Sequence, residues 1–454
     1  MLRSTTWFFS LCAATAIASV GQLVSACELC DIPDIVPCVC PSVLETIDAF
    51  QEGGDEGTAA FRTVGNGWTS TASGSSPLRE PKTLTWSVIP DGVSISGGQG
   101  EPTGPSTLRA FLDGIHHPGG GSPGGADLTQ RDWFPIMKSA FDRWDAVSGL
   151  TFLYESQDDG GTFMSQPGSL GVRGDHRIGG HHIDGITSLT ILAYNAFPNN
   201  SDMVIDTDEV GRYGNSSNNF RLFRNMLMHE IGHGLGLNHL DSSTFRYLME
   251  PFLDTTFDGP QFDDVLGIHR LYGDRFEESG GNDTALIATN LGVFAAGQLL
   301  TLGEDALDAP VAPTDVDFVS INHSGDHDYF KFSVANSGAV DIVLTPLGPT
   351  YQEGPQGGTQ TSFVAASKNN LSLFLYDSTG TNLLTSSALA GLGVAESIQG
   401  FLLTNPGDYY VRVSGSADVA QLYQLDLGFV PEPSGAVLLA SALLAFVGRG
   451  TRRA

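Results

Sequence analysis

One short segment in the middle of the chain constrains the fold and the chemistry more than any other feature. On a helix of about 3.6 residues per turn, His229 and His233 lie one turn apart on the same face, so both imidazoles can reach one metal ion. Gly236 can adopt the positive φ that ends a helix, which lets the chain return and brings His239 to the same ion. Three neutral imidazoles leave one position for a water, whose pKa zinc lowers to about 7. Glu230 is then the candidate base that takes a proton from this water as it attacks a peptide carbonyl.

The residues around this motif predict an amphipathic helix that supports it. Apolar side chains recur there at spacings of three and four residues: Phe220, Phe223, Met226, Leu227 and Ile231. The alternative is a packed helix that carries the histidines by chance. The added glycine and third histidine make chance a weaker explanation than it would be for His-Glu-x-x-His alone.

The motif, together with Tyr247-Leu248-Met249-Glu250-Pro251, resembles the metzincin clan, in which a tight turn carries a methionine beneath the metal. Among metzincins the chain looks most like the matrixins, because Pro251 follows Met249 by two positions and residues 263–273 are similar to the last helix of that family. The resemblance implies that Met249 forms the floor of the zinc site without binding the ion. It also implies that the segment at Pro251 forms a wall of the pocket for the residue after the scissile bond. The loop from His239 to Met249 is longer than is usual in matrixins, which leaves the shape of that pocket open.

Residues 192–198 resemble the matrixin edge strand, along which an extended substrate adds itself as a further strand. Leu192 and Ala193 are therefore expected to bind the substrate main chain. An ordinary edge strand is the alternative.

Residues 201–209 are similar to a matrixin loop that binds a structural calcium ion and supplies a histidine to a second zinc. Val204 and Tyr194 occupy places where that family has zinc ligands, so a structural zinc is not expected. Three carboxylates could hold a hard cation such as Ca²⁺: Asp184, Asp206 and Glu209. An acidic surface loop without an ion is the alternative. The remaining histidines of the region are predicted to be loop residues: His176, His181 and His182.

The rest of the matrixin-like region is predicted from periodicity. Residues 84–89 alternate as a strand does, residues 133–144 carry apolar side chains at helical spacing, and residues 150–154 form a further strand. Residues 91–130 are rich in Gly, Pro and Ser and are predicted to be a surface insertion.

Strand-like runs recur in the C-terminal part of the chain. They alternate with period two and are separated by turn residues, at positions 328–334, 340–344, 371–376 and 408–413, which predicts a β-sandwich. The segment resembles the bacterial pre-peptidase C-terminal domain. That resemblance implies an accessory domain, often removed after export, without catalysis of its own.

The predicted fold class is α+β: a metzincin-like catalytic domain, with a twisted mixed sheet and a zinc-binding helix, followed by an all-β sandwich. The length of 454 residues exceeds the length of chain that a single hydrophobic core usually supports. The expected organisation is a signal peptide (1–26), a cysteine-containing segment or propeptide (27–79), the peptidase domain (80–278), a linker (279–309), the sandwich (310–429) and a sorting tail (430–454).

The N-terminus has the pattern of a secretory signal peptide, with an apolar stretch from residue 7 to residue 20 and small residues at 24–26. Four cysteines follow it: Cys27, Cys30, Cys38 and Cys40. Two disulfides are expected in an oxidising compartment, and a lipid anchor on Cys27 is an alternative. Cys30-Asp31-Ile32-Pro33-Asp34 also resembles the matrixin latency switch, in which a propeptide thiolate binds the catalytic zinc, although Asp31 replaces the usual glycine.

At the C-terminus, Val430-Pro431-Glu432-Pro433-Ser434 precedes a short apolar run and three arginines, and closely resembles the PEP-CTERM sorting signal of bacterial envelope proteins. The run is shorter than the about 20 residues of a usual membrane span, so a removable tail fits better than a permanent anchor. The resemblance implies export through the inner membrane of a bacterium with an outer membrane, with the product either released or attached to the envelope.

The net charge of −29, from 22 basic and 51 acidic side chains, argues against binding of nucleic acid. Two functions remain open: a secreted zinc endopeptidase that cuts extended polypeptides, and an adhesive component whose metal site is vestigial. Glu230 favours the first, because a helix kept only for packing needs no carboxylate beside two zinc-spaced histidines. The expected partners are polypeptide substrates and exosortase-like sorting machinery, and the chain is expected to be a monomer.

Overall fold

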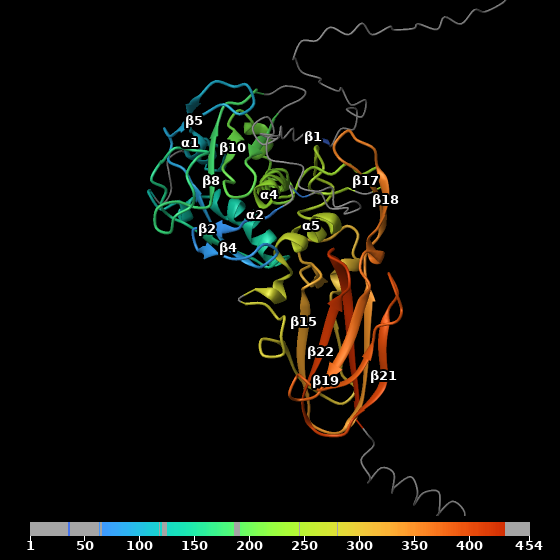
Figure 1. Cartoon of the computed structure of the whole chain (residues 1–454). Coiled ribbons are helices and arrows are strands. Elements are labelled where there is room, and N and C mark those ends of the chain that lie inside the picture. The colour runs from blue at the N-terminus through green and yellow to red at the C-terminus, as the bar shows by residue number, and fades with distance from the viewer. Residues whose placement is uncertain are drawn as a thin grey trace, which may run out of the picture.

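The computed structural model describes residues 35–36, 63, 66–117, 119, 125–185, 191–244, 246–278 and 280–431. The predicted signal peptide, the four cysteines after it and the sorting tail from residue 432 onward lie outside these residues. The described chain forms a helix-containing N-terminal part and a β-sandwich (Figure 1). This confirms the predicted α+β class. Within the described residues, no helix combines the length and the apolar character that crossing a membrane requires.

The N-terminal part is built on one five-stranded mixed sheet. Its strands, in spatial order, are β7 (Leu150–Tyr154), β4 (Lys82–Val88), β8 (His176–His181), β10 (Met203–Asp206) and β9 (Ala193–Asn195). The first four run parallel to one another, and β9 pairs antiparallel with β10 at the edge. The predicted strands at 84–89 and 150–154 are confirmed as β4 and β7.

Three longer helices pack in this part: α2 (Phe134–Ala146), α4 (Arg221–Leu235) and α5 (Phe262–Tyr272). Trp144 of α2 lies fully buried and donates its indole N–H to the Met228 carbonyl of α4, at 2.9 Å, which fixes the two helices against each other. Shorter elements complete the part: α1 (Leu108–His116), α3 (Val210–Tyr213), η1 (Leu128–Gln130), η2 (Arg275–Glu277), β2 (Ser70–Thr71), β3 (Gly74–Ser75), β5 (Ser94–Ile95) and β6 (Gly104–Pro105).

The region predicted to be a surface insertion contains helix α1. The prediction missed it because the surrounding glycines and prolines dominate the composition. Leu108 and Leu112 lie one helical turn apart and are both fully buried in the core, so α1 is an integral part of the fold.

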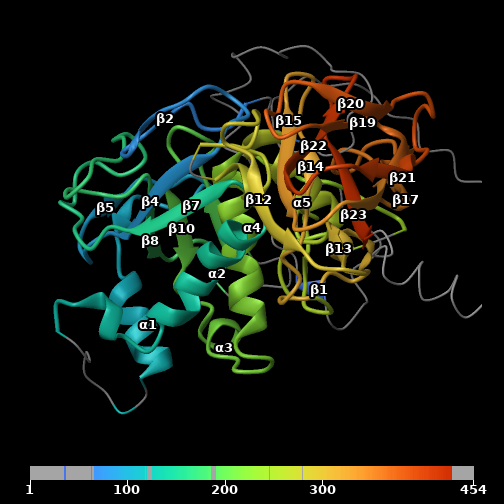
Figure 2. The ribbon, with the colours of Figure 1, turned by 90° about the horizontal axis from the view of Figure 1, so that it is seen from below.

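The C-terminal part is a sandwich of two antiparallel-rich sheets, seen from below in Figure 2. One sheet has the order β12 (Thr289–Phe294), β15 (His327–Val334), β22 (Gly407–Gly415), β19 (Leu371–Tyr376) and β20 (Leu383–Ser387). The other has the order β13 (Leu299–Leu302), β23 (Gln421–Pro431), β16 (Gly338–Pro346) and β21 (Glu396–Leu403), with β14 (Ser320–Ile321) on β23. Burial alternates residue by residue along β15 and β16, which confirms the period-two prediction.

Strands β12 and β13 fall within residues 279–309, the stretch that the sequence predicts as a linker. β12 pairs with β15 and β13 pairs with β23, so each extends one of the two sheets. Helix η3 (Glu304–Leu307) follows β13.

A hairpin, β17 (Thr350–Glu353) with β18 (Thr361–Val364), stands apart from both sheets and is followed by η4 (Ala365–Ser367). Figure 1 shows it on the α5 side of the N-terminal part. The two parts share one hydrophobic core, to which the C-terminal part contributes Val311, Phe318, Leu347, Tyr351, Phe363 and Leu422, among others. They are therefore packed as one body rather than joined by a free connector.

Candidate metal centre

Helix α4 carries the first two histidines and ends as the sequence predicts. Gly236 caps the helix with φ 104°, and its N–H bonds to the carbonyls of Gly232 and His233. The Leu237 N–H then returns to the Gly232 carbonyl at 2.9 Å, which reverses the chain. This reversal brings His239 back alongside the helix.

The three histidines converge on one point. The Nε2 atoms of His229, His233 and His239 lie 3.1, 3.2 and 3.3 Å from one another. A tetrahedral zinc ion with Zn–N bonds of about 2.0–2.1 Å would separate its nitrogens by about 3.3 Å. The triangle therefore has the size that zinc requires, and three nitrogen donors with one open position fit a catalytic rather than a structural zinc site.

Each of the three rings is held in the tautomer that metal binding needs. His229 Nδ1 lies 2.7 Å from the Leu248 carbonyl, His233 Nδ1 lies 2.8 Å from the Leu237 carbonyl, and His239 Nδ1 lies 2.8 Å from the amide oxygen of Gln356. Because each oxygen accepts a hydrogen bond from a protonated Nδ1, each Nε2 is unprotonated and presents its lone pair to the centre.

Burial keeps these imidazoles uncharged. Removal from water, together with the neighbouring His239, lowers the pKa of His229 to about 3. Burial likewise lowers the pKa of His233 and of His239. The rings are therefore neutral and ready for a cation at neutral pH.

Glu230 and the edge strand are linked through Asn195. The Glu230 side chain is fully buried, and its main-chain carbonyl accepts a hydrogen bond from the Asn195 amide on β9. β9 is the last strand of its sheet, with no further strand beside it among the described residues. Ala193 lies in this strand, whereas the Leu192 carbonyl already accepts the Asp206 N–H at 2.8 Å. The outer edge that a substrate could extend therefore begins at β9 itself.

Met249 lies directly beneath the zinc helix. A Cβ atom added to Gly232 would lie 2.5 Å from the Met249 sulfur, so only glycine permits this approach. Asp264 at the start of α5 holds the turn, because its carboxylate accepts the N–H groups of Leu248 at 2.8 Å and Met249 at 3.0 Å.

The chain after Met249 continues through buried Pro251 into β11 (Leu253–Asp254), which pairs antiparallel with β1 (Ile35–Val36). This pairing brings a short part of the N-terminal segment next to the predicted pocket wall. Cys30, the predicted latency switch, lies outside the described residues, and its role stays a prediction.

The predicted calcium ligands are only partly grouped. The ligand atoms that come within 4.8 Å of one another belong to His182, Asp206 and Asp208. Asp184 accepts the Ile191 N–H at 3.2 Å, and Glu209 pairs with Arg212 at 2.5 Å. His182 and Asp208 were missed, although the alternation of Asp206 and Asp208 along the chain was a visible signal.

A second acidic group lies where the two parts of the molecule join. The carboxylates of Glu277, Asp326 and Asp328 are buried and lie within 4.8 Å of one another. Burial raises the pKa of all three well above the usual range, and repulsion from the nearby Asp274 carboxylate adds to this effect for each of them. Hard oxygen donors of this kind suit a cation such as Ca²⁺. No pattern along the sequence predicts this group, because Glu277 is far from the two aspartates along the chain.

The prediction that His176, His181 and His182 are loop residues is wrong for the first two. His176 and His181 begin and end strand β8 and are buried. Gly179 and Gly180 within the strand made the segment look like a loop. A Cβ at Gly180 would lie 2.7 Å from the Ile205 carbonyl, so these glycines instead permit close strand packing.

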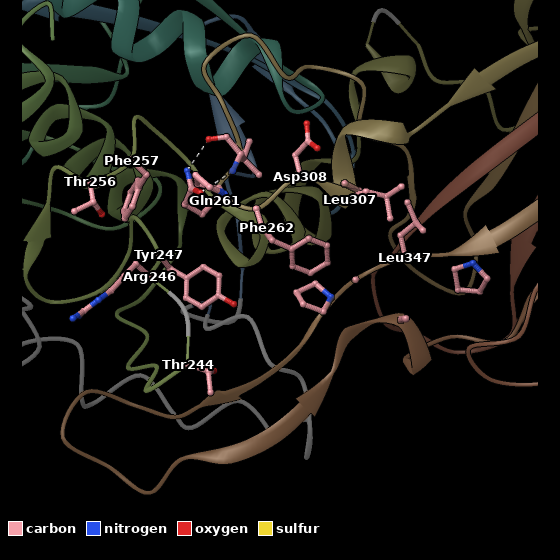
Figure 3. A pocket seen from close by; sticks show the side chains of 18 residues that line it. Thr244, Arg246, Tyr247, Thr256, Phe257, Gln261, Phe262, Leu307, Asp308 and Leu347 are labelled. Carbon is pink, nitrogen blue, oxygen red and sulfur yellow. Dashed lines mark hydrogen bonds between the residues drawn. The ribbon is translucent and has the colours of Figure 1, made fainter.

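A mostly apolar pocket of about 730 Å³ lies between the two parts of the molecule (Figure 3). Tyr247, Phe257 and Phe262 line it from the N-terminal part, and Leu307 and Leu347 line it from the sandwich. None of the zinc-spaced histidines lines it, so it is separate from the metal centre.

Comparison with known proteins agrees with this geometry. Residues 123–273 match the Matrixin family, Peptidase_M10, and residues 326–415 match the bacterial pre-peptidase C-terminal domain. Interstitial collagenase of Sus scrofa is 34% identical over 149 residues, which are 32% of this chain and 29% of that protein. A hatching enzyme of Paracentrotus lividus is 33% identical over 156 residues, which are 33% of this chain and 24% of that protein.

The matched stretch thus spans less than a third of either relative. Among solved structures, the pre-peptidase C-terminal domain of collagenase from Bacillus anthracis is similar at 16% identity, with a TM-score of 0.18 over 31% of this chain and 93% of that one. By the family models alone, residues 123–273, which include the three histidines, match a matrixin domain, and residues 326–415 match a bacterial pre-peptidase C-terminal domain.

Proposed function

We propose that the chain is a zinc-dependent endopeptidase that hydrolyses peptide bonds in extended polypeptides. The observation that carries the proposal is the convergence of three Nε2 atoms at 3.1–3.3 Å, all in neutral rings with their Nδ1 protons engaged. The matrixin match covers these residues and supports the same activity. Secretion is part of the proposal and rests on the predicted signals at the two ends of the chain.

Different residues of the chain have different roles in this reaction. A bound zinc ion would supply Lewis acidity and lower the pKa of a water to about 7. Glu230, next to His229 on the buried face of α4, takes the proton of the attacking water and passes it to the leaving amine. β9 holds the substrate by main-chain hydrogen bonds, which bind an extended chain with little regard to its side chains. The segment at Pro251 shapes the pocket for the residue after the cleaved bond.

The test is the Glu230→Gln variant, which removes the base while keeping the size of the side chain. We expect it to retain its zinc, measured by metal analysis, and to lose activity on a mixed peptide pool by about 10²- to 10⁴-fold. Glu304→Gln, at an exposed position on η3, serves as the matched control and should keep full activity. Undiminished cleavage by Glu230→Gln would rule out the assigned base.

A further inference from the structure

The three zinc-spaced histidines differ in what holds their Nδ1 atoms. For His229 and His233 the acceptor is a main-chain carbonyl of the matrixin domain, at 2.7 and 2.8 Å. For His239 the acceptor is a side chain, the Gln356 amide oxygen at 2.8 Å, which is 117 positions further along the chain. Gln356 belongs to the C-terminal domain, so that domain reaches the metal centre.

Gln356 sits at the tip of the β17–β18 hairpin, whose strands pair only with each other. In Figure 1 the hairpin extends from the sandwich along the matrixin domain, on the side where α5 lies. It therefore adds nothing to either sheet of the sandwich. It contacts instead the loop between His239 and Met249 and the start of α5.

The tip of the hairpin is held in register with that loop by several bonds. Asp241 and Gly354 exchange both main-chain hydrogen bonds, at 2.9 and 3.0 Å. The Gln352 N–H donates to Thr244 Oγ1 and the Ser243 N–H donates to the Gln360 amide oxygen, each at 2.9 Å.

The base of the hairpin is anchored by aromatic packing. Tyr351 is buried, and its ring packs against that of Tyr247 at a tilt of 52°, with ring centres 5.3 Å apart. The Tyr351 hydroxyl donates a hydrogen bond to Asp263 on α5. A hairpin fixed at its base and along the loop delivers the Gln356 amide to a defined place. The hydrogen bond between Gln356 and His239 is thus one of several contacts that hold the hairpin against the matrixin domain.

The chemistry of the site defines which way the Gln356 amide points. If the amide were reversed, its NH₂ group would face His239 Nδ1 and the ring proton would move to Nε2. That proton would then point at the other two Nε2 atoms, 3.2 and 3.3 Å away, and would block a metal ion. Only the oxygen-inward orientation leaves the His239 lone pair available.

We propose that Gln356 is a positioning residue for His239, and that the β17–β18 hairpin thereby makes the C-terminal domain a structural part of the metal centre. This inference rests on the proposed function for the identity of the ion. The amide oxygen fixes the ring orientation and the tautomer of His239, and partners of this kind typically change metal affinity by about 10- to 100-fold when they are removed. Because Gln356 is itself exposed, we expect the lower end of that range.

The experiment measures the zinc affinity of the full chain by competition with a chromophoric chelator. Gln356→Ala should bind zinc about 10-fold more weakly than the unmodified protein. Gln356→Glu keeps an acceptor oxygen and should restore the affinity. Gln360→Ala is the matched control, because it removes a glutamine of the same hairpin that contacts the loop but no histidine.

Equal zinc affinity of Gln356→Ala and the unmodified protein would overturn the proposal. So would an equal loss in Gln360→Ala, since the effect would then come from docking of the hairpin rather than from the amide. An unmodified protein that binds no zinc would instead contradict the proposed function. A melting temperature that is the same for both alanine variants without zinc confirms that the affinity difference is local.

Discussion

At the scale of single residues, the metal centre depends on a position without a side chain, Gly232. Gly232 lies on the zinc helix between the two histidines, where the Met249 sulfur and the Trp144 ring approach from below. Its added Cβ would lie 2.5 Å from the sulfur and 3.3 Å from the tryptophan. A helix interior usually favours alanine over glycine, so packing overrides intrinsic helix propensity here.

The prediction is that Gly232→Ala destabilises the protein by about 1–3 kcal/mol, because overpacking forces Met249 or the helix to move. Gly114 in helix α1 is the matched control, since nothing lies within 4 Å of its added Cβ. Gly114→Ala should stabilise by up to about 1 kcal/mol, the ordinary preference of a helix. Chemical denaturation of both variants measures the contrast, and a Gly232→Ala variant as stable as Gly114→Ala would show that the contact with Met249 is loose.

At the scale of elements, α5 ties the turn beneath the centre to the rest of the fold. Asp264 occupies the first turn of α5 and accepts three main-chain N–H groups, one from Gln261 that caps the helix and two from the Met249 turn. Burial raises its pKa to about 6, so the carboxylate is buried at a cost that these three donors offset. One side chain thus starts a helix and holds the floor of the centre.

We expect Asp264→Asn to lose about 2–4 kcal/mol of unfolding free energy, because the new NH₂ group faces N–H donors in a buried site. Asp142→Asn on α2 is the matched control, since Asp142 only pairs with Lys138 on the surface. That variant should stay within about 0.5 kcal/mol of the unmodified protein. Urea titrations monitored by circular dichroism would test both, and a small loss in Asp264→Asn would show that the Met249 turn is held elsewhere.

At the scale of the whole molecule, local patterns were predictable from the sequence and long-range partners were not. The convergence of the three histidines, the helix end at Gly236 and the strands of the sandwich all follow from spacing within a few helical turns or strand repeats. The contact between His239 and Gln356 joins residues 117 positions apart, and no periodicity reports it. The same holds for the Glu277, Asp326 and Asp328 group.

The joint between the two domains differs from the linker predicted at residues 279–309, because strands β12 and β13 lie in that stretch. The sequence predicts a linker there, and the resemblance to the pre-peptidase C-terminal domain implies an accessory domain after it. The structure instead places side chains of both domains in one core, and hydrogen bonds cross the joint. One of these involves His269 on α5, which lies 2.9 Å from Ser320 Oγ of β14 and 2.7 Å from the Val147 carbonyl after α2.

His269 makes this joint sensitive to acid. Burial lowers its pKa to about 4 from the usual 6.5, so the unfolded chain binds a proton between these values while the folded chain does not. The stabilisation is therefore complete above about pH 6.5 and is lost as the pH falls towards 4, which amounts to about 2 kcal/mol between pH 7 and pH 5. His269→Gln keeps a donor to the Val147 carbonyl but removes the titration. Between pH 7 and pH 5, His269→Gln should therefore lose about 2 kcal/mol less unfolding free energy than the unmodified protein.

Urea titrations at pH 7, 6 and 5 measure this slope. His182→Gln is the contrasting variant, because His182 is exposed and Asp208 raises its pKa, so its contribution has the opposite sign. A group whose pKa is raised on folding stabilises the folded state below its unfolded pKa, and this stabilisation is lost as the pH rises. Removing His182 therefore cannot reduce the loss of unfolding free energy at acid pH. If His269→Gln and the unmodified protein lost stability in parallel from pH 7 to pH 5, the acid sensitivity would have to originate away from the joint between α5 and the sandwich.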